Sequence, residues 1–287
     1  MPLDLDLKAD IESALERLVG GCGEQCLSDH AFSNLYLFRQ VHAYRYLPGP
    51  YPCVSGQTYD GVRHLLPLFP LHQAPLSELR ALLAGHDCFF PVARRDTELL
   101  DSQRFVCTQS RDDADYLYPG ANFRDYRGRA LAKKRNLMKQ LLAAHDLSCK
   151  PYAPALRPDA LALLEGWMRD KVKGQGEADQ AACAEALQHA ADFGLAGFVH
   201  YAEGRPAGFL LAQEIQPTVF VMRFAKGLEA FKGIYQYMFH HFCTHFERPV
   251  AWLNFEQDMG LANFRRTKLS YQPASLLEKF RVRLRAP

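Results

Sequence analysis

Three polar side chains in one short segment have the types and the spacing that acid–base chemistry requires. Asn254, Glu256 and Asp258 occupy every second position in and just after residues 251–257, which we expect to form a buried strand. Side chains two residues apart on a strand share one face and lie roughly 7 Å apart. Buried carboxylates need partners, so this row is expected to face a cleft, a basic group or both. The structural alternative is that the acids cap the helix predicted over residues 261–268.

The densest positive cluster of the sequence, residues 127–136, is a candidate site for an anion. On a helical projection Lys134 falls within an apolar arc, whereas Arg129 and Lys133 fall on the opposite face. A cation on the inward face must reach solvent past its neighbours or pair with an anion. We therefore expect Lys134 to contact a carboxylate, such as Glu256, or a ligand phosphate. Arg129 and Lys133 are equally consistent with an ordinary solvated face.

The connection that ends in Gly233, Ile234 and Tyr235 leads from a predicted strand into a predicted helix, residues 233–246. Backbone N–H groups at the start of a helix can hold a phosphate, and a glycine allows close approach. A plain turn before a core helix explains the same residues. The histidines at 240, 241 and 245 diverge around this helix, so we predict no metal site.

The bulk composition excludes several classes of protein. The formal net charge of the 287 residues is only +2, which argues against binding of long nucleic acid by bulk electrostatics, and we expect no DNA partner. No apolar run approaches the roughly 18 residues of a membrane span, and the acidic first residues do not resemble a signal peptide. The eight scattered cysteines are typical of reduced thiols, so we expect a cytoplasmic protein.

The order of the predicted elements indicates an α/β (α+β) protein with two similar halves, each a mixed sheet flanked by helices. Asp60-Gly61 predicts a hairpin between strands at residues 51–59 and 62–69. Residues 122–145 read as one long helix or two abutting helices. The order then restarts with a strand at 148–152, a hairpin of strands 198–202 and 206–214, and a final strand at 276–284. We expect two domains, residues 1–145 and 146–287.

Three segments together resemble one known family. They are the runs Ser28–Arg39, Arg127–Asn136 and Asn254–Pro273. They resemble the soluble proteins grouped with the C-terminal domain of phosphatidylglycerol lysyltransferase, a domain of unknown function. That family is similar to tandem GNAT-type acyltransferases, so the resemblance implies two GNAT-like halves. It also implies acyl or aminoacyl transfer, from aminoacyl-tRNA or acyl-coenzyme A, to an amine or hydroxyl of a small-molecule acceptor.

If the protein is such an acyltransferase, each candidate residue has an expected role. Glu256 would be the general base and Asn254 would orient a carbonyl group. The donor phosphate would be held by Arg129, Lys134 and Arg135 and by the N–H groups of Gly233, Ile234 and Tyr235. Asp258, Lys268 and Tyr271 would line the substrate cleft.

The donor would arrive as a co-substrate, with the tRNA acceptor end as one candidate partner and no tightly bound cofactor. A non-catalytic module that binds a small ligand or a tRNA end is the main alternative. A protein that binds RNA through the basic helix is disfavoured by the near-neutral charge.

Overall fold

The computed structural model describes residues 1–171 and 179–285, and these divide into two compact units. Unit 1 comprises Met1–Tyr116, Gln257–Arg265 and Leu276–Pro287; unit 2 comprises Leu117–Glu256 and Arg266–Ser275. The predicted domains, 1–145 and 146–287, do not coincide with these units. The C-terminal strand joins the first sheet, and residues 117–145 belong with the second unit. Such exchanges between segments distant in sequence leave no mark on local periodicity.

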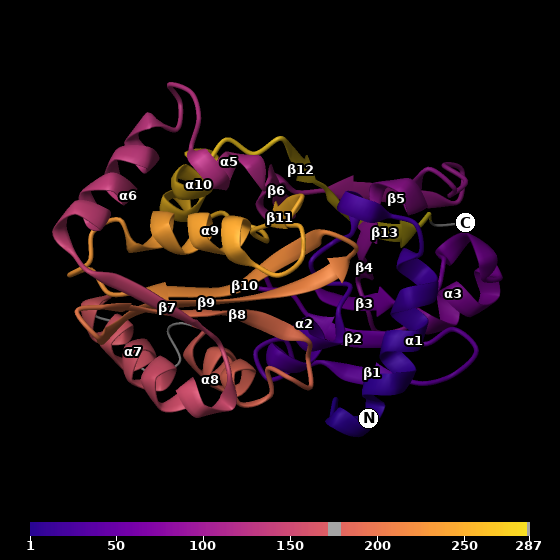
Figure 1. Ribbon diagram of the computed structural model, residues 1–287. Coiled ribbons are helices and arrows are strands. Elements are labelled where there is room, and N and C mark those ends of the chain that lie inside the picture. The colour runs from indigo at the N-terminus through magenta and orange to yellow at the C-terminus, as the bar shows by residue number, and fades with distance from the viewer. Residues whose placement is uncertain (172–178, 286–287) are drawn as a thin grey trace. The chain divides into compact units, whose positions relative to one another are not determined.

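Unit 1 contains a mixed six-stranded sheet in the order β1-β2-β3-β4-β13-β5 (Figure 1). Its strands are β1 (Arg45–Leu47), β2 (Cys53–Gln57), β3 (Arg63–Pro67), β4 (Cys88–Ala93), β5 (Phe105–Gln109) and β13 (Lys279–Leu284). The hairpin predicted at Asp60-Gly61 is present, since β2 and β3 pair antiparallel. The pair β3–β4 is parallel, and β13 is inserted between β4 and β5.

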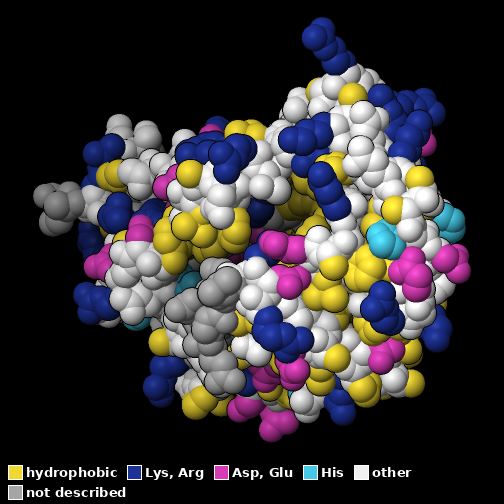
Figure 2. Space-filling model, turned by 90° about the vertical axis from the view of Figure 1, so that its left-hand side faces the viewer, with side chains coloured by type: hydrophobic (Ala, Val, Ile, Leu, Met, Phe, Trp, Pro, Cys, Tyr) yellow, Lys and Arg dark blue, Asp and Glu magenta, His cyan; other side chains and the backbone are white. Residues whose placement is uncertain are grey.

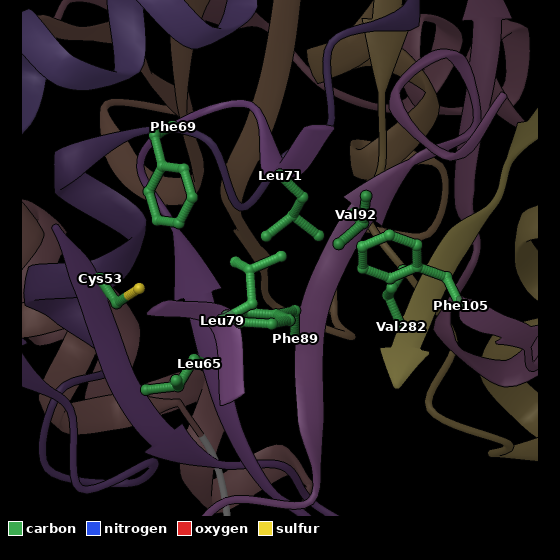
Figure 3. Packing of buried hydrophobic residues seen from close by; sticks show 9 residues of the cluster. All are labelled: Cys53, Leu65, Phe69, Leu71, Leu79, Phe89, Val92, Phe105 and Val282. Atoms are coloured by element: carbon green, nitrogen blue, oxygen red, sulfur yellow. The ribbon is translucent and has the colours of Figure 1, made fainter. Parts of the chain in front are cut away.

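The helices of unit 1 are α1 (Lys8–Val19), α2 (Phe32–Leu37), α3 (Leu76–Leu82) and α4 (Arg94–Thr97). Apolar side chains from the sheet, α3 and the neighbouring loops form a buried core, which Figure 3 shows from close by. Phe89 on β4 and Val282 on β13 lie in this core with Leu79 of α3. Full burial of side chains of this size contributes on the order of 1.5–3 kcal/mol each. The last strand of the chain is thereby fixed to the first sheet.

Unit 2 is built on a mixed sheet of order β12-β6-β11-β10-β9-β8-β7. Its strands are β6 (Asp115–Pro119), β7 (Leu147–Pro151), β8 (Leu195–Ala202), β9 (Arg205–Gln216), β10 (Val219–Gly227), β11 (Trp252–Asn254) and β12 (Ser275–Leu277). The predicted hairpin is present as β8 and β9, which continue antiparallel into β10. The pair β10–β11 is parallel and covers only Val219–Val221 against Trp252–Asn254.

The helices of unit 2 are α5 (Ala121–Asp125), α6 (Ala132–Ala144), α7 (Arg157–Asp170), α8 (Gln180–Gln188) and α9 (Ile234–His245). Figure 1 shows α9 above β8–β10 and α7 and α8 below them. Because both faces are covered, the central strands are apolar on both sides, as the almost continuous burial of Phe209–Ala212 illustrates. The predicted segment 122–145 is two helices, and α10 (Ala262–Leu269) follows β11 along the chain.

The fold is therefore a mixed α/β architecture with two mixed sheets flanked by helices. Each sheet contains a parallel pair, β3–β4 in the first and β10–β11 in the second. The predicted single strand at 276–284 is two strands, β12 and β13, which belong to different sheets.

Candidate active site

Asn254 shapes the end of β11. The strand stops at Asn254 instead of running to residue 257 as predicted. The Oδ1 atom of Asn254 accepts a hydrogen bond of 2.7 Å from the backbone N–H of Glu256, and Glu256 has a left-handed backbone with φ of 56°. This local bond replaces the next rung of the sheet and turns the chain. Asn254 has no exposed surface, so it holds the turn and is not open to a substrate carbonyl as the sequence suggested.

Glu256 forms an ion pair with Arg223, a residue of β10 that the sequence reasoning missed. The Arg223 Nη1 atom donates to Glu256 Oε1 across 2.7 Å, and Arg223 also donates from Nε and Nη2 to Gln213 Oε1 on β9. The Arg223 side chain is 0% exposed, whereas that of Glu256 is 23% exposed. Arg223 lies where the β9–β10 register shifts, between Met222 and Phe224. Its one signal in the sequence is a cation inside an otherwise apolar run of a strand.

Lys268 and Tyr271 lie beside the same turn. The Lys268 ammonium donates to the carbonyl oxygens of Phe255 and Glu256 at 2.6 and 3.1 Å. The Tyr271 ring lies 6.3 Å from the Phe255 ring, and its hydroxyl accepts a 2.7 Å hydrogen bond from Gln236. Tyr271 is buried, and this burial raises its pKa. The Tyr271 ring therefore provides an aromatic surface that neighbouring side chains can contact.

The Lys134 side chain lies over the Tyr271 ring. Its ammonium nitrogen is 3.9 Å from the centre of the Tyr271 ring, a cation–π contact. In the part of the chain that the structure describes, the ammonium has no carboxylate in ion-pairing reach, so the expected pair with Glu256 is not formed. Burial, with a smaller effect of neighbouring Lys133, lowers the pKa of Lys134 to about 8. Lys134 is thus a half-buried cation held by a ring, and a ligand anion would be a better partner.

The other basic residues of the cluster have different surroundings. Arg129, Lys133 and Lys139 are exposed. Figure 2 views the side of the molecule where Figure 1 places α6, and Lys and Arg side chains gather in its upper part. Arg135 instead donates to the carbonyl oxygens of Tyr126 and Gly128 at 2.5 and 3.4 Å. Arg135 therefore fixes the loop before α6, which accounts for its charge without a ligand.

Gly233 allows the start of α9 to pack closely against α6. Its φ of 102° suits glycine, and a Cβ atom there would lie 2.3 Å from the carbonyl oxygen of Leu137 on α6. The N–H of Ile234 already donates to the Phe231 carbonyl oxygen. The Tyr235 hydroxyl accepts hydrogen bonds from Trp167 Nε1 and the N–H of Gly227. The bond of Ile234 and the close packing at Gly233 favour the plain turn over a phosphate site at this helix start.

Asp258 is enclosed within unit 1 and does not line a substrate cleft. Its carboxylate accepts hydrogen bonds from the Arg265 guanidinium at 2.9 Å from both Nε and Nη2, from Tyr116 Oη at 2.5 Å and from the N–H of Gly260 at 2.9 Å. Burial alone would raise its pKa, but these hydrogen bonds hold the pKa of Asp258 well below its ordinary value. The bond to Gly260 closes a local turn two residues along the chain, before α10 begins at Ala262, so it is not the helix cap that the sequence suggested.

The protein family described as phosphatidylglycerol lysyltransferase, C-terminal, matches residues 24–283. The chain belongs to this family. A comparison with curated proteins gives no match. Membership in the phosphatidylglycerol lysyltransferase C-terminal family supports acyl or aminoacyl transfer as the general class of reaction.

Solved structures are similar to the whole chain. A conserved protein of unknown function from Bacteroides thetaiotaomicron has 23% identity and a TM-score of 0.82, with 99% of each chain covered. The structure of L-PGS from Bacillus licheniformis has 12% identity and a TM-score of 0.59, covering 96% of this chain and 90% of that one. A tandem GNAT protein from the clavulanic acid biosynthesis pathway has 10% identity and a TM-score of 0.52, covering 100% and 98%. At these identities the likeness concerns the fold, and it confirms the tandem GNAT prediction.

Across the described ranges, no helix combines the length and apolar character needed to cross a bilayer.

Proposed function

We propose that this protein is a cytoplasmic acyltransferase that moves an acyl or aminoacyl group from an activated donor to the amine or hydroxyl of a small acceptor. The donor would be an aminoacyl-tRNA or an acyl thioester that enters as a co-substrate. The observation that supports this most directly is the carboxylate of Glu256, which a fully buried guanidinium fixes at the end of a parallel strand pair. Ligands of open α/β sheets commonly bind at the carboxyl ends of such strands.

Glu256 is the group that we assign to proton removal from the acceptor. The donor is already activated, so orientation supplies much of the rate and the base has a modest task. Arg223 is a positioning residue, because its bond to Oε1 restrains the carboxylate without touching substrate. Asn254 and Lys268 add to this restraint through the backbone of the turn, by bonds to the N–H and the carbonyl oxygen of Glu256.

Lys134 is the group that we assign to a phosphate of the donor. Aminoacyl-tRNA and acyl-coenzyme A both carry phosphates, and an ammonium held over a ring gains a charge-assisted hydrogen bond when an anion arrives. Tyr271 links Lys134 to the turn, since its ring contacts the ammonium and lies near Phe255, which precedes Glu256. Arg129, exposed before α6, would add longer-range attraction. The proposal needs no bound cofactor.

The test uses hydroxylamine as a small acceptor, with acetyl-coenzyme A and a mixture of aminoacyl-tRNAs as the two donor classes. Hydroxamate formation at pH 7 is measured for the wild type, Glu256→Gln and Glu247→Gln. Glu247 is an exposed glutamate, so its variant is a matched control. We expect Glu256→Gln to keep the fold, checked by circular dichroism, and to lose roughly 100- to 10,000-fold in rate. The control should match the wild type.

Two outcomes would decide against this proposal. If Glu256→Gln turned over at the wild-type rate, the Glu256 carboxylate would have no role in the reaction. No hydroxamate above the protein-free background with either donor class, combined with donor binding that depends on Lys134, would instead favour a module that binds a donor end without catalysis. The donor class that reacts also separates aminoacyl from acyl transfer.

A further inference from the structure

A cysteine and a histidine form a close pair on a part of unit 2 that the proposed transfer reaction does not use. The Cys149 Sγ atom, on β7, lies 2.8 Å from Nε2 of His241, on α9. Cys149 is partly exposed, so a small reagent can reach the thiol. The sheet order places β7 at one edge, three strands from β10 and Arg223. The pair is therefore separate from the turn at Glu256.

His200 is a second, independent polar group at this pair. It is the cross-strand partner of Cys149 in the β7–β8 register, so the two side chains share a face of the sheet. Its ring lies 5.2 Å from the His241 ring and is perpendicular to it. His200 has no exposed surface, and among the described residues no group lies in hydrogen-bonding geometry to either ring nitrogen. A buried imidazole without partners is costly, which makes it available to a ligand that accepts or donates a hydrogen bond.

The surroundings keep both members of the pair neutral. Burial, with the nearby His245 and His240, lowers the pKa of His241 to about 4. Burial also raises the pKa of the Cys149 thiol. A thiol beside a neutral imidazole is a nucleophile with its proton acceptor already in place. Within the described residues, no three His, Cys, Asp or Glu side chains are grouped to hold a metal ion, so thiol chemistry explains the arrangement better.

We propose that Cys149 is an acyl-accepting thiol, with His241 as its general base and an acyl thioester as the substrate class. The Cys149 sulfur attacks the thioester carbonyl carbon and forms a new carbon–sulfur bond, while its proton moves to Nε2 of His241. The original carbon–sulfur bond breaks, and the leaving thiolate takes that proton. One thioester and one thiol give one thioester and one thiol, and nothing is oxidised or reduced.

A thioester fits better than an alkylating agent for two reasons. Its leaving thiolate is basic enough to take up a proton at pH 7, and the protonated His241 can supply that proton. Its carbonyl oxygen gains negative charge during the attack, and the ring N–H of His200 is a donor of the kind that stabilises such an oxygen.

The test measures acetylation by the acetyl thioester of N-acetylcysteamine, mapped by peptide mass spectrometry. Cys107 is an internal control, because it is more exposed than Cys149 and no imidazole contacts it in the described part of the chain. We expect Cys149 to react at least about tenfold faster than Cys107 at pH 7. Treatment with neutral hydroxylamine should remove the acetyl group, which identifies a thioester. The Glu256→Gln variant should behave identically, so this result is independent of the proposed transferase.

Two further measurements test whether His241 is the general base. His241→Asn should reduce the Cys149 rate to about that of Cys107, whereas His72→Asn, at an exposed histidine of unit 1, should leave it unchanged. If His241→Asn does not fold, the wild type still decides. With His241 as base, the rate should be nearly constant between pH 6 and pH 8, because the imidazole is already unprotonated there. Equal rates at the two cysteines, or a tenfold rise per pH unit at Cys149, would overturn the proposal.

Discussion

The guanidinium of Arg223 and the carboxylate of Glu256 lie 2.7 Å apart, with the arginine wholly buried and the glutamate partly in solvent. This asymmetry predicts unequal effects on stability. Glu256→Ala would leave a buried charge without this carboxylate and should lower the free energy of unfolding by about 3–5 kcal/mol. Arg223→Met fills similar space and leaves a carboxylate that water can reach, so it should cost no more than about 2 kcal/mol.

Urea unfolding of the two variants measures this difference. The double variant Arg223→Met/Glu256→Gln should be more stable than Glu256→Ala, since it buries no charge. Equal costs for the two single changes, or a larger cost for Arg223→Met, would show that the pair does not control stability in this way.

We expect anion binding at Lys134 to weaken as the pH rises. Its pKa is about 8, so the ammonium is charged at pH 7 and largely neutral at pH 9. Sulfate is a suitable probe, because its own charge is constant over this range. We expect wild-type affinity for sulfate, measured by calorimetry or NMR titration, to fall between pH 7 and pH 9. Lys134→Gln should lose about tenfold at pH 7, near the lower limit for a hydrogen bond to a charged group, and should show no such fall.

Lys139→Gln is the matched control for this measurement. Lys139 lies on the same helix and is exposed, so its removal should change sulfate affinity by far less than tenfold. Equal effects of the two changes would mean that sulfate senses the general charge of α6 and not a site at Lys134.

We expect a substitution at Gly233 to disturb the packing between the start of α9 and α6. In Gly233→Ala the new Cβ atom would overlap the Leu137 carbonyl, and the backbone would have to keep its positive φ. Gly204 also has a positive φ, but nothing lies within 4 Å of its Cβ position. Gly204→Ala should therefore cost about 1 kcal/mol of backbone strain, whereas Gly233→Ala should cost about 1–3 kcal/mol more from overpacking. Thermal unfolding of both variants measures this difference. Similar losses of stability would show that α6 can move away from the new Cβ atom with no cost in free energy.

The sequence predicted the local features of the fold and only part of the site. Asp60-Gly61 is a local signal, and the hairpin that it predicts is present. The turn at Glu256 is local too, but the pattern of alternating residues hid the competing bond from the Asn254 side chain. Lys134 is expected to be mostly buried beside an anion, but it is only half-buried and its partner is a ring and not a carboxylate.

Long-range pairing accounts for what the sequence could not predict. Arg223 was visible as a cation in an apolar strand, but its partners Gln213 and Glu256 are 10 and 33 residues away in sequence. The placement of β13 between β4 and β5 depends on packing partners almost 200 residues distant, such as Phe89 opposite Val282. Periodicity reports which face of a segment is buried, and it does not report which segment covers that face.

Asp258 predicts a contribution to stability that disappears in acid. Hydrogen bonds from Arg265, Tyr116 and Gly260 hold its folded pKa below the ordinary value of 3.8. A carboxyl group with a depressed folded pKa stabilises the fold fully above its unfolded pKa, and this stabilisation is lost as pH falls towards the folded pKa. The advantage of the wild type over Asp258→Asn should therefore be constant from pH 7 to pH 5 and should shrink by about 1 kcal/mol at pH 3.

At pH 7 Asp258→Asn should cost about 3 kcal/mol, near the lower limit for a broken buried pair, because Arg265 is partly hydrated. Asp112→Asn is the matched control. It removes the other carboxylate that contacts Arg265, but Asp112 is itself largely accessible, so the cost should stay below about 1 kcal/mol. Denaturant unfolding of the three proteins at pH 7, 5 and 3 measures both effects. An Asp258→Asn variant that tracks the wild type in parallel down to pH 3 would mean that this carboxylate has no depressed pKa in the folded protein.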